Sequence, residues 1–90
     1  MEISFDESKR LKTLEERNLD FARASEVFAG PEYTVLDDRR DYGEERFNTF
    51  GYLDKRLVSL TWTVREGRRR IISMRKANDR EQARFEKRMG

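Results

Sequence analysis

Hydroxyl and guanidinium side chains alternate with apolar ones in the second half of the chain, in a pattern suited to binding phosphate. Leu60, Trp62 and Val64 take every second position, and Ile72 and Met74 repeat the alternation. Such a period of two is typical of strands with one buried face. The opposite face would carry the threonines, serine and arginines that lie between, and arginine holds phosphate through paired hydrogen bonds. We expect this face to bind an anion and favour the backbone phosphate of RNA.

Residue types that are absent narrow the chemistry. The chain has no cysteine and no histidine, which removes disulfides, thiolate zinc sites, the commonest metal ligand and the commonest general base. We therefore expect no metal and no cofactor. No apolar run is long enough to span a membrane, and the N-terminal residues contain no signal-peptide core, so we expect a cytoplasmic protein that does not contact membranes.

Acidic and basic residues are separated along the chain. Residues 1–45 contain 7 Lys or Arg and 13 Asp or Glu, whereas residues 46–90 contain 13 and 5. Such asymmetry favours contact with nucleic acid or another polyanion. Attraction between the two halves within the fold is the other reading. Although 42% of the residues are charged, the signs nearly cancel and the apolar residues are periodic, so we expect residues 1–90 to fold as a single domain.

The elements that would position the basic face follow from caps, turns and periodicity. Asp6, Asp20 and Asn78 are expected N-caps, and Gly30-Pro31 ends the second helix. We predict an α+β fold in the order β-α-α-β-β-β-β-α, with an antiparallel sheet packed on two N-terminal helices and a C-terminal helix. The predicted strands are 2–5, 33–36, 46–53, 56–65 and 69–76, and the predicted helices are 7–17, 21–29 and 79–88.

Strand register predicts which side chains share a face. A two-residue turn at Asp54-Lys55 pairs Phe47 with Trp62. For the next hairpin we expect an odd loop centred on Gly67, because the even alternative mixes the two faces. The odd loop pairs Arg65 with Arg69, Trp62 with Ile72 and Leu60 with Met74. The predicted core face is Phe47, Val58, Leu60, Trp62, Val64, Ile72 and Met74; the predicted opposite face is Arg46, Asn48, Ser59, Thr61, Thr63, Arg65, Ser73 and Arg75, with Phe50, Tyr52, Leu57 and Ile71 at its apolar end.

Several segments together resemble one family of proteins. They are Asp6-Glu7-Ser8-Lys9, Leu19-Asp20-Phe21, Glu26-Val27-Phe28 with Gly30-Pro31, Gly43-Glu44-Glu45-Arg46 and residues 70–77. In this order and spacing the chain resembles the BrnT toxins, small ribonucleases of type II toxin–antitoxin modules with a RelE-like fold. The resemblance implies an endoribonuclease that cleaves mRNA, free or on the ribosome, and so inhibits translation and growth. It also implies a BrnA-like ribbon-helix-helix antitoxin, through which alone operator DNA would be bound.

The resemblance also suggests which residues act. The family's polar set falls on Lys9, Glu45, Arg46, Arg65 and Arg75, which we take as candidate catalytic residues. Arg69, Arg70, Ser73 and Tyr52 are candidate RNA-binding residues. Many members have Lys-His-Gly at the end of the first helix, where this chain has Glu16-Arg17-Asn18, so chemistry that depends on that histidine is not open to this chain.

Metal-independent RNA cleavage needs few groups. A base removes the 2′-hydroxyl proton, the freed oxygen attacks the adjacent phosphorus, and cations stabilise the pentacoordinate state. The candidate bases are Glu45 and, if deprotonated, Lys9. Each candidate also has a plainer role, such as an ion pair for Glu45 or Arg46 and a solvated helix position for Lys9. The alternative function is a non-catalytic module that binds nucleic acid or protein through the same basic face.

Overall fold

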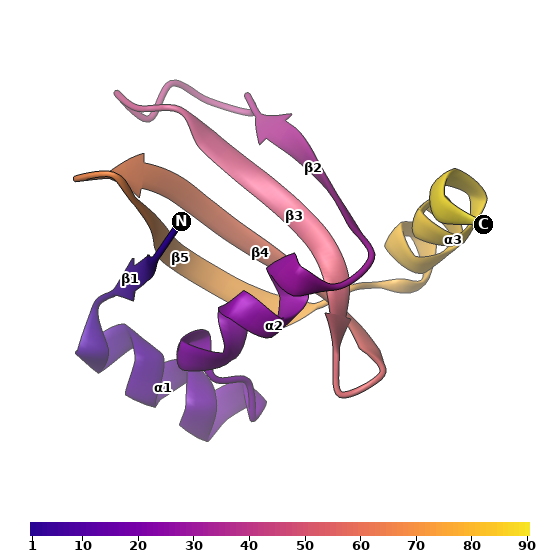
Figure 1. Cartoon of the computed structure of the whole chain (residues 1–90), viewed down its shortest axis with the longest axis horizontal. Helices are drawn as coiled ribbons and strands as arrows, with labels where there is room; N and C mark the ends of the chain where they lie inside the picture. Colours follow the sequence, from indigo (N-terminus) through magenta and orange to yellow (C-terminus); the bar gives the residue numbers. More distant parts are fainter.

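The computed structural model describes residues 1–90 as a five-stranded sheet in the order β1-β5-β4-β3-β2, with helices on both faces (Figure 1). Along the chain lie β1 (Ile3–Phe5), α1 (Glu7–Arg17), the 3-10 turn η1 (Phe21–Arg23), α2 (Ala24–Ala29), β2 (Glu32–Asp37), β3 (Arg46–Leu53), β4 (Arg56–Arg65), β5 (Arg68–Lys76) and α3 (Asp79–Met89). This order confirms the predicted α+β arrangement, with boundaries within a residue or two. None of the helices has both the length and the apolarity needed to cross a membrane.

Local side-chain chemistry fixes the helix ends. The Asp6 carboxylate accepts a hydrogen bond from the Lys9 backbone N–H at 3.1 Å and so begins α1. Asn18 ends that helix in the left-handed conformation, with φ of 57°. Asn78 and Glu81 form the reciprocal capping box expected at the start of α3.

The sheet is mixed, which corrects the expectation of a purely antiparallel one. β1 lies parallel to β5 at the edge of the sheet, with Ile3 opposite Arg69 and Phe5 opposite Ile71, whereas the other pairs are antiparallel. Parallel neighbours need a long connection. Here it comprises both N-terminal helices and three strands, a pairing that no local pattern in the sequence predicts.

Register in the β3–β4 hairpin is as predicted, with Phe47 opposite Trp62 and Leu53 opposite Arg56. The β4–β5 hairpin corrects the expected register near its turn. Glu66 and Gly67 both have positive φ and form a two-residue turn, so Arg65 pairs with Arg68 rather than with Arg69.

A shift in pairing follows between Thr61 and Trp62. Trp62 lies opposite Ile71, yet Leu60 lies opposite Met74 as expected. The pairing set by the two-residue turn therefore holds from the turn to Trp62, and the pairing that we expected from an odd loop holds from Thr61 onward. The β-bulge at Ile72 absorbs the extra residue.

The bulge also changes which side chains are buried. Ile71 belongs to the core and is 2% exposed, whereas Ile72 is only partly buried; the expected roles of the two isoleucines are exchanged. Val64, expected in the core, is 50% exposed because it lies near the open end of the sheet, beyond the helices.

The main core lies between the sheet and the segment that contains η1 and α2, on what we call the helix-covered face. Its buried side chains are Leu19, Phe21, Ala24, Val27, Leu53, Val58, Leu60, Trp62, Ile71 and Met74. The Trp62 indole N–H donates to the Thr49 hydroxyl at 2.8 Å, which satisfies a buried polar group. Gly51 lets α2 approach closely, since a Cβ there would lie 2.8 Å from a Val27 methyl.

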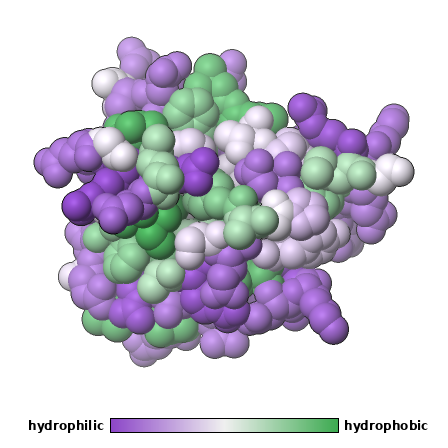
Figure 2. Space-filling model, in the orientation of Figure 1, coloured by the Kyte–Doolittle hydropathy of each residue, from purple (hydrophilic) through white to green (hydrophobic).

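A smaller cluster lies on the opposite side of the sheet. Phe85 of α3 stacks on Tyr33, with ring centroids 5.7 Å apart, and packs with Phe50, Leu57 and Ala77. α3 thereby covers one end of that face and leaves the other end open. Figure 2, in the orientation of Figure 1, shows green hydrophobic patches interrupted by purple hydrophilic residues on the face turned to the viewer.

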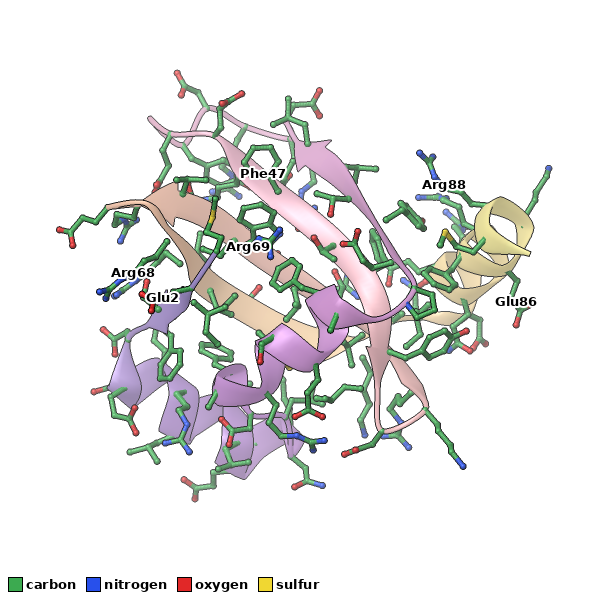
Figure 3. All side chains as sticks on the ribbon, in the orientation of Figure 1. Glu2, Phe47, Arg68, Arg69, Glu86 and Arg88 are labelled. Atoms are coloured by element: carbon green, nitrogen blue, oxygen red, sulfur yellow. The ribbon has the colours of Figure 1, made fainter.

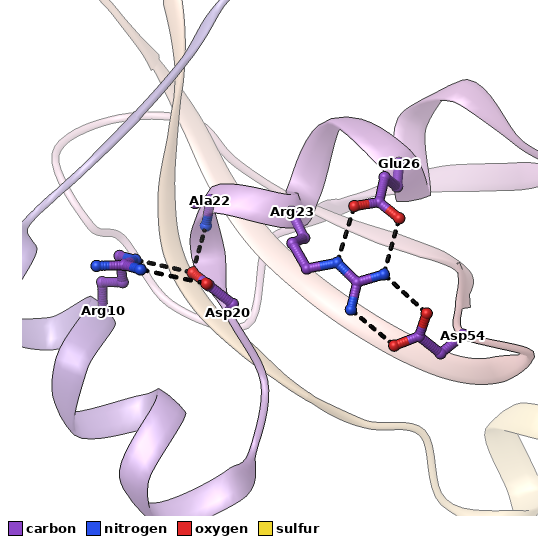
Figure 4. A network of polar contacts seen from close by, with 6 residues as sticks. All are labelled: Arg10, Asp20, Ala22, Arg23, Glu26 and Asp54. Atoms are coloured by element: carbon purple, nitrogen blue, oxygen red, sulfur yellow. Dashed lines mark hydrogen bonds and ion pairs between the residues drawn. The ribbon is translucent and has the colours of Figure 1, made fainter.

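Arginine–carboxylate pairs hold the helix-covered face together (Figure 4). Arg23 donates to both oxygens of Glu26 at 2.8 and 2.9 Å and to both oxygens of Asp54 at 2.7 Å. Arg10 binds Asp20, which also accepts from the Ala22 backbone N–H. These contacts tie α1 to η1, and the start of α2 to the β3–β4 turn.

Candidate functional site

The side of the sheet opposite the helix-covered face carries most of the predicted polar set, and we call it the arginine face. Its register places three arginines there on three strands: Arg46 opposite Asp37, Arg65 opposite Arg68, and Arg75 opposite Ser59. A middle row of short side chains crosses the face from β2 to β5 and comprises Val35, Asn48, Thr61 and Ser73. The prediction that these three arginines share one face is therefore confirmed.

Two of the arginines meet at a carboxylate that the sequence did not single out. Arg65 Nη2 donates to the two oxygens of Glu44 at 3.0 and 3.3 Å. Arg46 Nη2 lies 3.9 Å from Glu44 Oε1, which makes the carboxylate the point where both cations converge. Burial raises the pKa of the Glu44 carboxyl, but the hydrogen bonds from Arg65 and the charges of both arginines outweigh it and hold that pKa below its usual value.

The Arg46 side chain is further fixed by an aromatic ring. Its guanidinium carbon lies 4.0 Å from the centroid of the Tyr42 ring, within range for a cation–π contact. Its Nε is buried and has no hydrogen-bond partner. A buried donor without a partner is costly, and because this nitrogen is shielded, a ligand has to reach the terminal nitrogens of the guanidinium instead.

Glu45 is next to Glu44 in the chain, but it contacts the sheet through its backbone and not through its side chain. Its carbonyl accepts a hydrogen bond from the Thr63 hydroxyl at 2.6 Å, which ties the β2–β3 loop to β4. Its side chain is exposed and takes part in none of the salt bridges. A shallow cavity of about 190 Å³ lined by Glu44, Glu45, Phe47, Thr63 and Val64 adjoins the two carboxylates.

Arg75 lies at the other end of the arginine face, next to α3. Its two terminal nitrogens donate to the Glu81 carboxylate at 2.7 and 2.8 Å. Hydrogen bonding to Arg75 lowers the pKa of Glu81, and the same contact raises the pKa of Arg75. Six residues of β4 separate Ser59, opposite Arg75, from Arg65, or about 20 Å of strand. Arg75 therefore does not join Glu44, Arg46 and Arg65, which we call the Glu44 cluster.

The remaining candidates are spread over both faces. Arg70 pairs with Thr63 and Ser73 with Thr61, which puts both on the arginine face. Arg69 turns to the helix-covered side, where its guanidinium carbon lies 3.9 Å from the Phe28 ring centroid (Figure 3). Lys9 is exposed on α1.

Tyr52 is the remaining candidate RNA-binding residue. It is 40% exposed, and its ring meets Phe85 edge-on at a centroid distance of 5.3 Å. It therefore lies at the end of the sheet that α3 covers, away from the Glu44 cluster.

Two further charged residues of this face were missed from the sequence. The Asp37 carboxylate, with 1% of its side chain exposed, accepts hydrogen bonds from Arg39 Nε at 2.8 Å and Nη2 at 2.9 Å. These residues and Glu44 lie in a run of alternating charge, 37–46, where no periodicity distinguishes one residue from the next. No three or more acidic residues gather closely enough to form a metal site.

A comparison with known families matches residues 5–81 to the model for BrnT, described as a ribonuclease toxin of type II toxin–antitoxin systems. The matched segment runs from the end of β1 into the first turn of α3 and contains the whole arginine face. A search of curated proteins finds no match.

Proposed function

The chain belongs to the BrnT family of ribonuclease toxins of type II toxin–antitoxin systems, and on this premise we propose that the Glu44 cluster is its RNA-cleaving centre. The observation that carries the proposal is the convergence of Arg46 and Arg65 on one carboxylate at the open end of the arginine face. The reaction is metal-independent and proceeds by attack of the ribose 2′-oxygen on the adjacent phosphorus.

Arg65 and Arg46 bind the phosphate under attack. Arg65 uses only Nη2 in its contacts with Glu44, so its Nε and Nη1 remain available as donors. The terminal nitrogens of Arg46, of which Nη2 lies 3.9 Å from Glu44, add further donors. As the 2′-oxygen adds, negative charge grows on the phosphoryl oxygens, and fixed guanidinium groups stabilise it without reorganising.

Glu44 is the base that the geometry favours. Its lowered pKa keeps it ionised at neutral pH and ready to accept the 2′-hydroxyl proton. A base of low pKa is weak, so the arginines supply most of the rate enhancement. The 2′-oxygen forms a bond to phosphorus and the bond to the 5′-oxygen breaks. The leaving oxygen takes a proton from water, so the products carry a 2′,3′-cyclic phosphate and a 5′-hydroxyl.

The cellular role follows from the family. We propose that the protein cleaves mRNA in the cytoplasm, free or on the ribosome, and so inhibits translation until a BrnA-like ribbon-helix-helix antitoxin binds it. Operator DNA would be bound only through that antitoxin. The α+β order, with an antiparallel hairpin series packed on N-terminal helices, supports a RelE-like fold.

Purified protein incubated with RNA and EDTA tests the activity. We expect cleavage products with 2′,3′-cyclic phosphate ends, detected by mass spectrometry. RNA that stays intact but migrates more slowly in a gel would favour the alternative, a non-catalytic binding module with the same basic face. Loss of cleavage on adding EDTA would contradict metal independence.

Paired glutamine variants identify the base. Glu44→Gln is expected to lower the cleavage rate about 10²–10⁴-fold, whereas Glu45→Gln, a change of the same kind one residue along, has a small effect. A greater loss from Glu45→Gln would assign the base to Glu45, and loss from Lys9→Ala alone would assign it to Lys9. Circular dichroism of each variant controls for folding.

A further inference from the structure

We propose that Arg39, Asn48 and Arg75 form a second subsite on the arginine face, which holds an RNA phosphate next to the one under attack. The inference rests on the proposed function and adds to it the path of the RNA backbone. It also assigns Asp37 as a positioning residue that acts through Arg39. None of these four residues takes part in the contacts between Glu44, Arg46 and Arg65.

Asp37 fixes the direction of Arg39. The carboxylate is buried near the open end of β2, and a buried charge has to be paired. Its cross-strand neighbour is Arg46, yet Asp37 binds Arg39 through two parallel hydrogen bonds instead. Hydrogen bonding by Arg39 lowers the pKa of the Asp37 carboxyl, which is therefore ionised at neutral pH. The rigid pairing sets the plane of the guanidinium.

Arg39 keeps free donors on its outer side. Its contacts with Asp37 use Nε and Nη2, and Nη1 takes part in no hydrogen bond. The side chain is 73% exposed. A guanidinium anchored at one edge and open at the other is preorganised to bind a second oxyanion.

Arg75 approaches from the other side of the same row. It follows Ser73 by two residues on β5 and lies opposite Ser59, so it stands on the arginine face beside the middle row. Hydrogen bonding by Glu81 raises the pKa of Arg75, and the charge of Arg39 opposes that rise. The Nε of Arg75 is not used in its contacts with Glu81. Asp37 and Glu81 each balance the charge of one of these guanidinium groups, so what the two offer a phosphate is the donors left over, Arg39 Nη1 and Arg75 Nε.

The middle row beneath them offers further donors. The Thr61 hydroxyl donates to Asn48 Oδ1 at 2.7 Å, so the Asn48 amide group directs its N–H donors elsewhere. Ser73 lies opposite Thr61 and is partly exposed.

Spacing links the two subsites. Asn48 lies two residues along β3 from Arg46, a rise of about 6.6 Å. This is close to the separation of neighbouring phosphates in an extended RNA strand. An RNA strand with its reacting phosphate at Arg46 and Arg65 would therefore place the next phosphate over Asn48.

Binding of a short 2′-fluoro oligonucleotide tests the subsite. This RNA analogue has no attacking hydroxyl, so its Kd can be measured without cleavage. Arg39→Ala should raise its Kd about tenfold and reduce the slope of log K against log salt by about one. Arg56→Ala is the matched control, because Arg56 is an exposed arginine at the end of β4 away from Arg65. It should change neither the Kd nor the salt slope.

Asp37→Asn tests the positioning role. It should weaken binding as Arg39→Ala does, and combining the two changes should add little further loss, because both remove one interaction. If Asp37→Asn does not fold, Arg39→Ala alone carries the test.

The outcomes separate this inference from the proposed function. Equal Kd and salt slope for Arg39→Ala and Arg56→Ala would overturn the subsite even if the wild-type protein cleaves RNA. Cleavage that fails while Arg39→Ala still weakens binding would overturn the catalytic assignment and leave the subsite standing. Weaker antitoxin binding by Arg39→Ala with unchanged RNA binding would overturn the subsite in favour of a protein contact.

Discussion

Arginines lie on both faces of the sheet, and carboxylates hold them in different ways. On the helix-covered face Arg23 is gripped by two carboxylates, and four hydrogen bonds of 2.7 to 2.9 Å use both terminal nitrogens and Nε. On the arginine face, Arg46 and Arg65 share one carboxylate, and the contact of Arg46 is 3.9 Å long. The ratio of cations to anions is reversed between the two networks.

In our proposal, this difference separates a structural role on the helix-covered face from a binding role on the arginine face. A guanidinium with its donors saturated by its own protein has nothing left for a ligand, and it joins elements that lie far apart in sequence. Two guanidinium groups that share a carboxylate keep unused donors and a net positive charge, and both favour binding of a phosphate. Arginine content alone would not distinguish the two cases.

The largest expected effect contrasts one arginine from each network. Arg65→Ala should lower kcat/KM for RNA cleavage about 10²–10³-fold and leave the thermal midpoint nearly unchanged, because it removes stabilisation of the transition state. Arg23→Ala should lower the thermal midpoint and leave the activity of the folded fraction intact. Equal losses of activity and stability in both variants would show that the two networks do not differ in role.

Gly51→Ala tests whether the helix-covered face serves stability alone. The added methyl would lie 2.8 Å from Val27 Cγ1 and 3.2 Å from the Pro31 carbonyl, so α2 has to shift. We expect a loss of about 1–3 kcal/mol in the free energy of unfolding, measured with urea. Cleavage per folded molecule should be unchanged; a fall in kcat would mean that α2 also shapes the catalytic face.

Acid titration tests how much the carboxylates that arginines hold, on both faces of the sheet, contribute to stability. The pKa values of Asp20, Asp37 and Glu81 are lowered in the folded protein, chiefly by hydrogen bonds from Arg10, Arg39 and Arg75 respectively. Groups with a depressed folded pKa contribute stability above their unfolded pKa of about 4, and this is lost as pH falls through the folded value. The thermal midpoint should be flat from about pH 7 to 5 and fall below about pH 4.

Asp20→Asn is the control for that titration. The variant lacks one of the paired carboxylates, so its thermal midpoint should be lower than that of the wild type at neutral pH, and the two should converge in acid. A constant difference across the whole pH range would mean that the Arg10–Asp20 pair does not contribute through its charge.

Turns and caps show how far local sequence specifies this fold. Asp6, Asn18 and Asn78 act within a few residues of themselves, and each took the role that its side-chain chemistry predicts. The Asp54-Lys55 turn likewise set the β3–β4 register correctly. The β4–β5 register was wrong near its turn because the β-bulge at Ile72 depends on packing beneath the sheet rather than on local pattern.

Charged residues in the 37–46 loop show where prediction from sequence stops. Strand periodicity placed Arg46 and Arg65 on one face, but the sequence analysis selected Glu45, whereas the structure brings Glu44 to both arginines. It also did not distinguish Arg39 from Arg40. Which carboxylate faces the arginines depends on how the loop folds back, and the Thr63 hydroxyl fixes that by holding the Glu45 carbonyl.

By itself, the sequence determined the elements, their order, the family and a face rich in arginine, because periodicity, caps and composition act over short stretches of chain. The tertiary structure alone decided that β1 pairs with β5, that Arg69 leaves the arginine face, and that Arg46 and Arg65 share Glu44 while Arg75 is held by Glu81. Those choices depend on packing and charge pairing between residues distant along the chain, which no local pattern encodes.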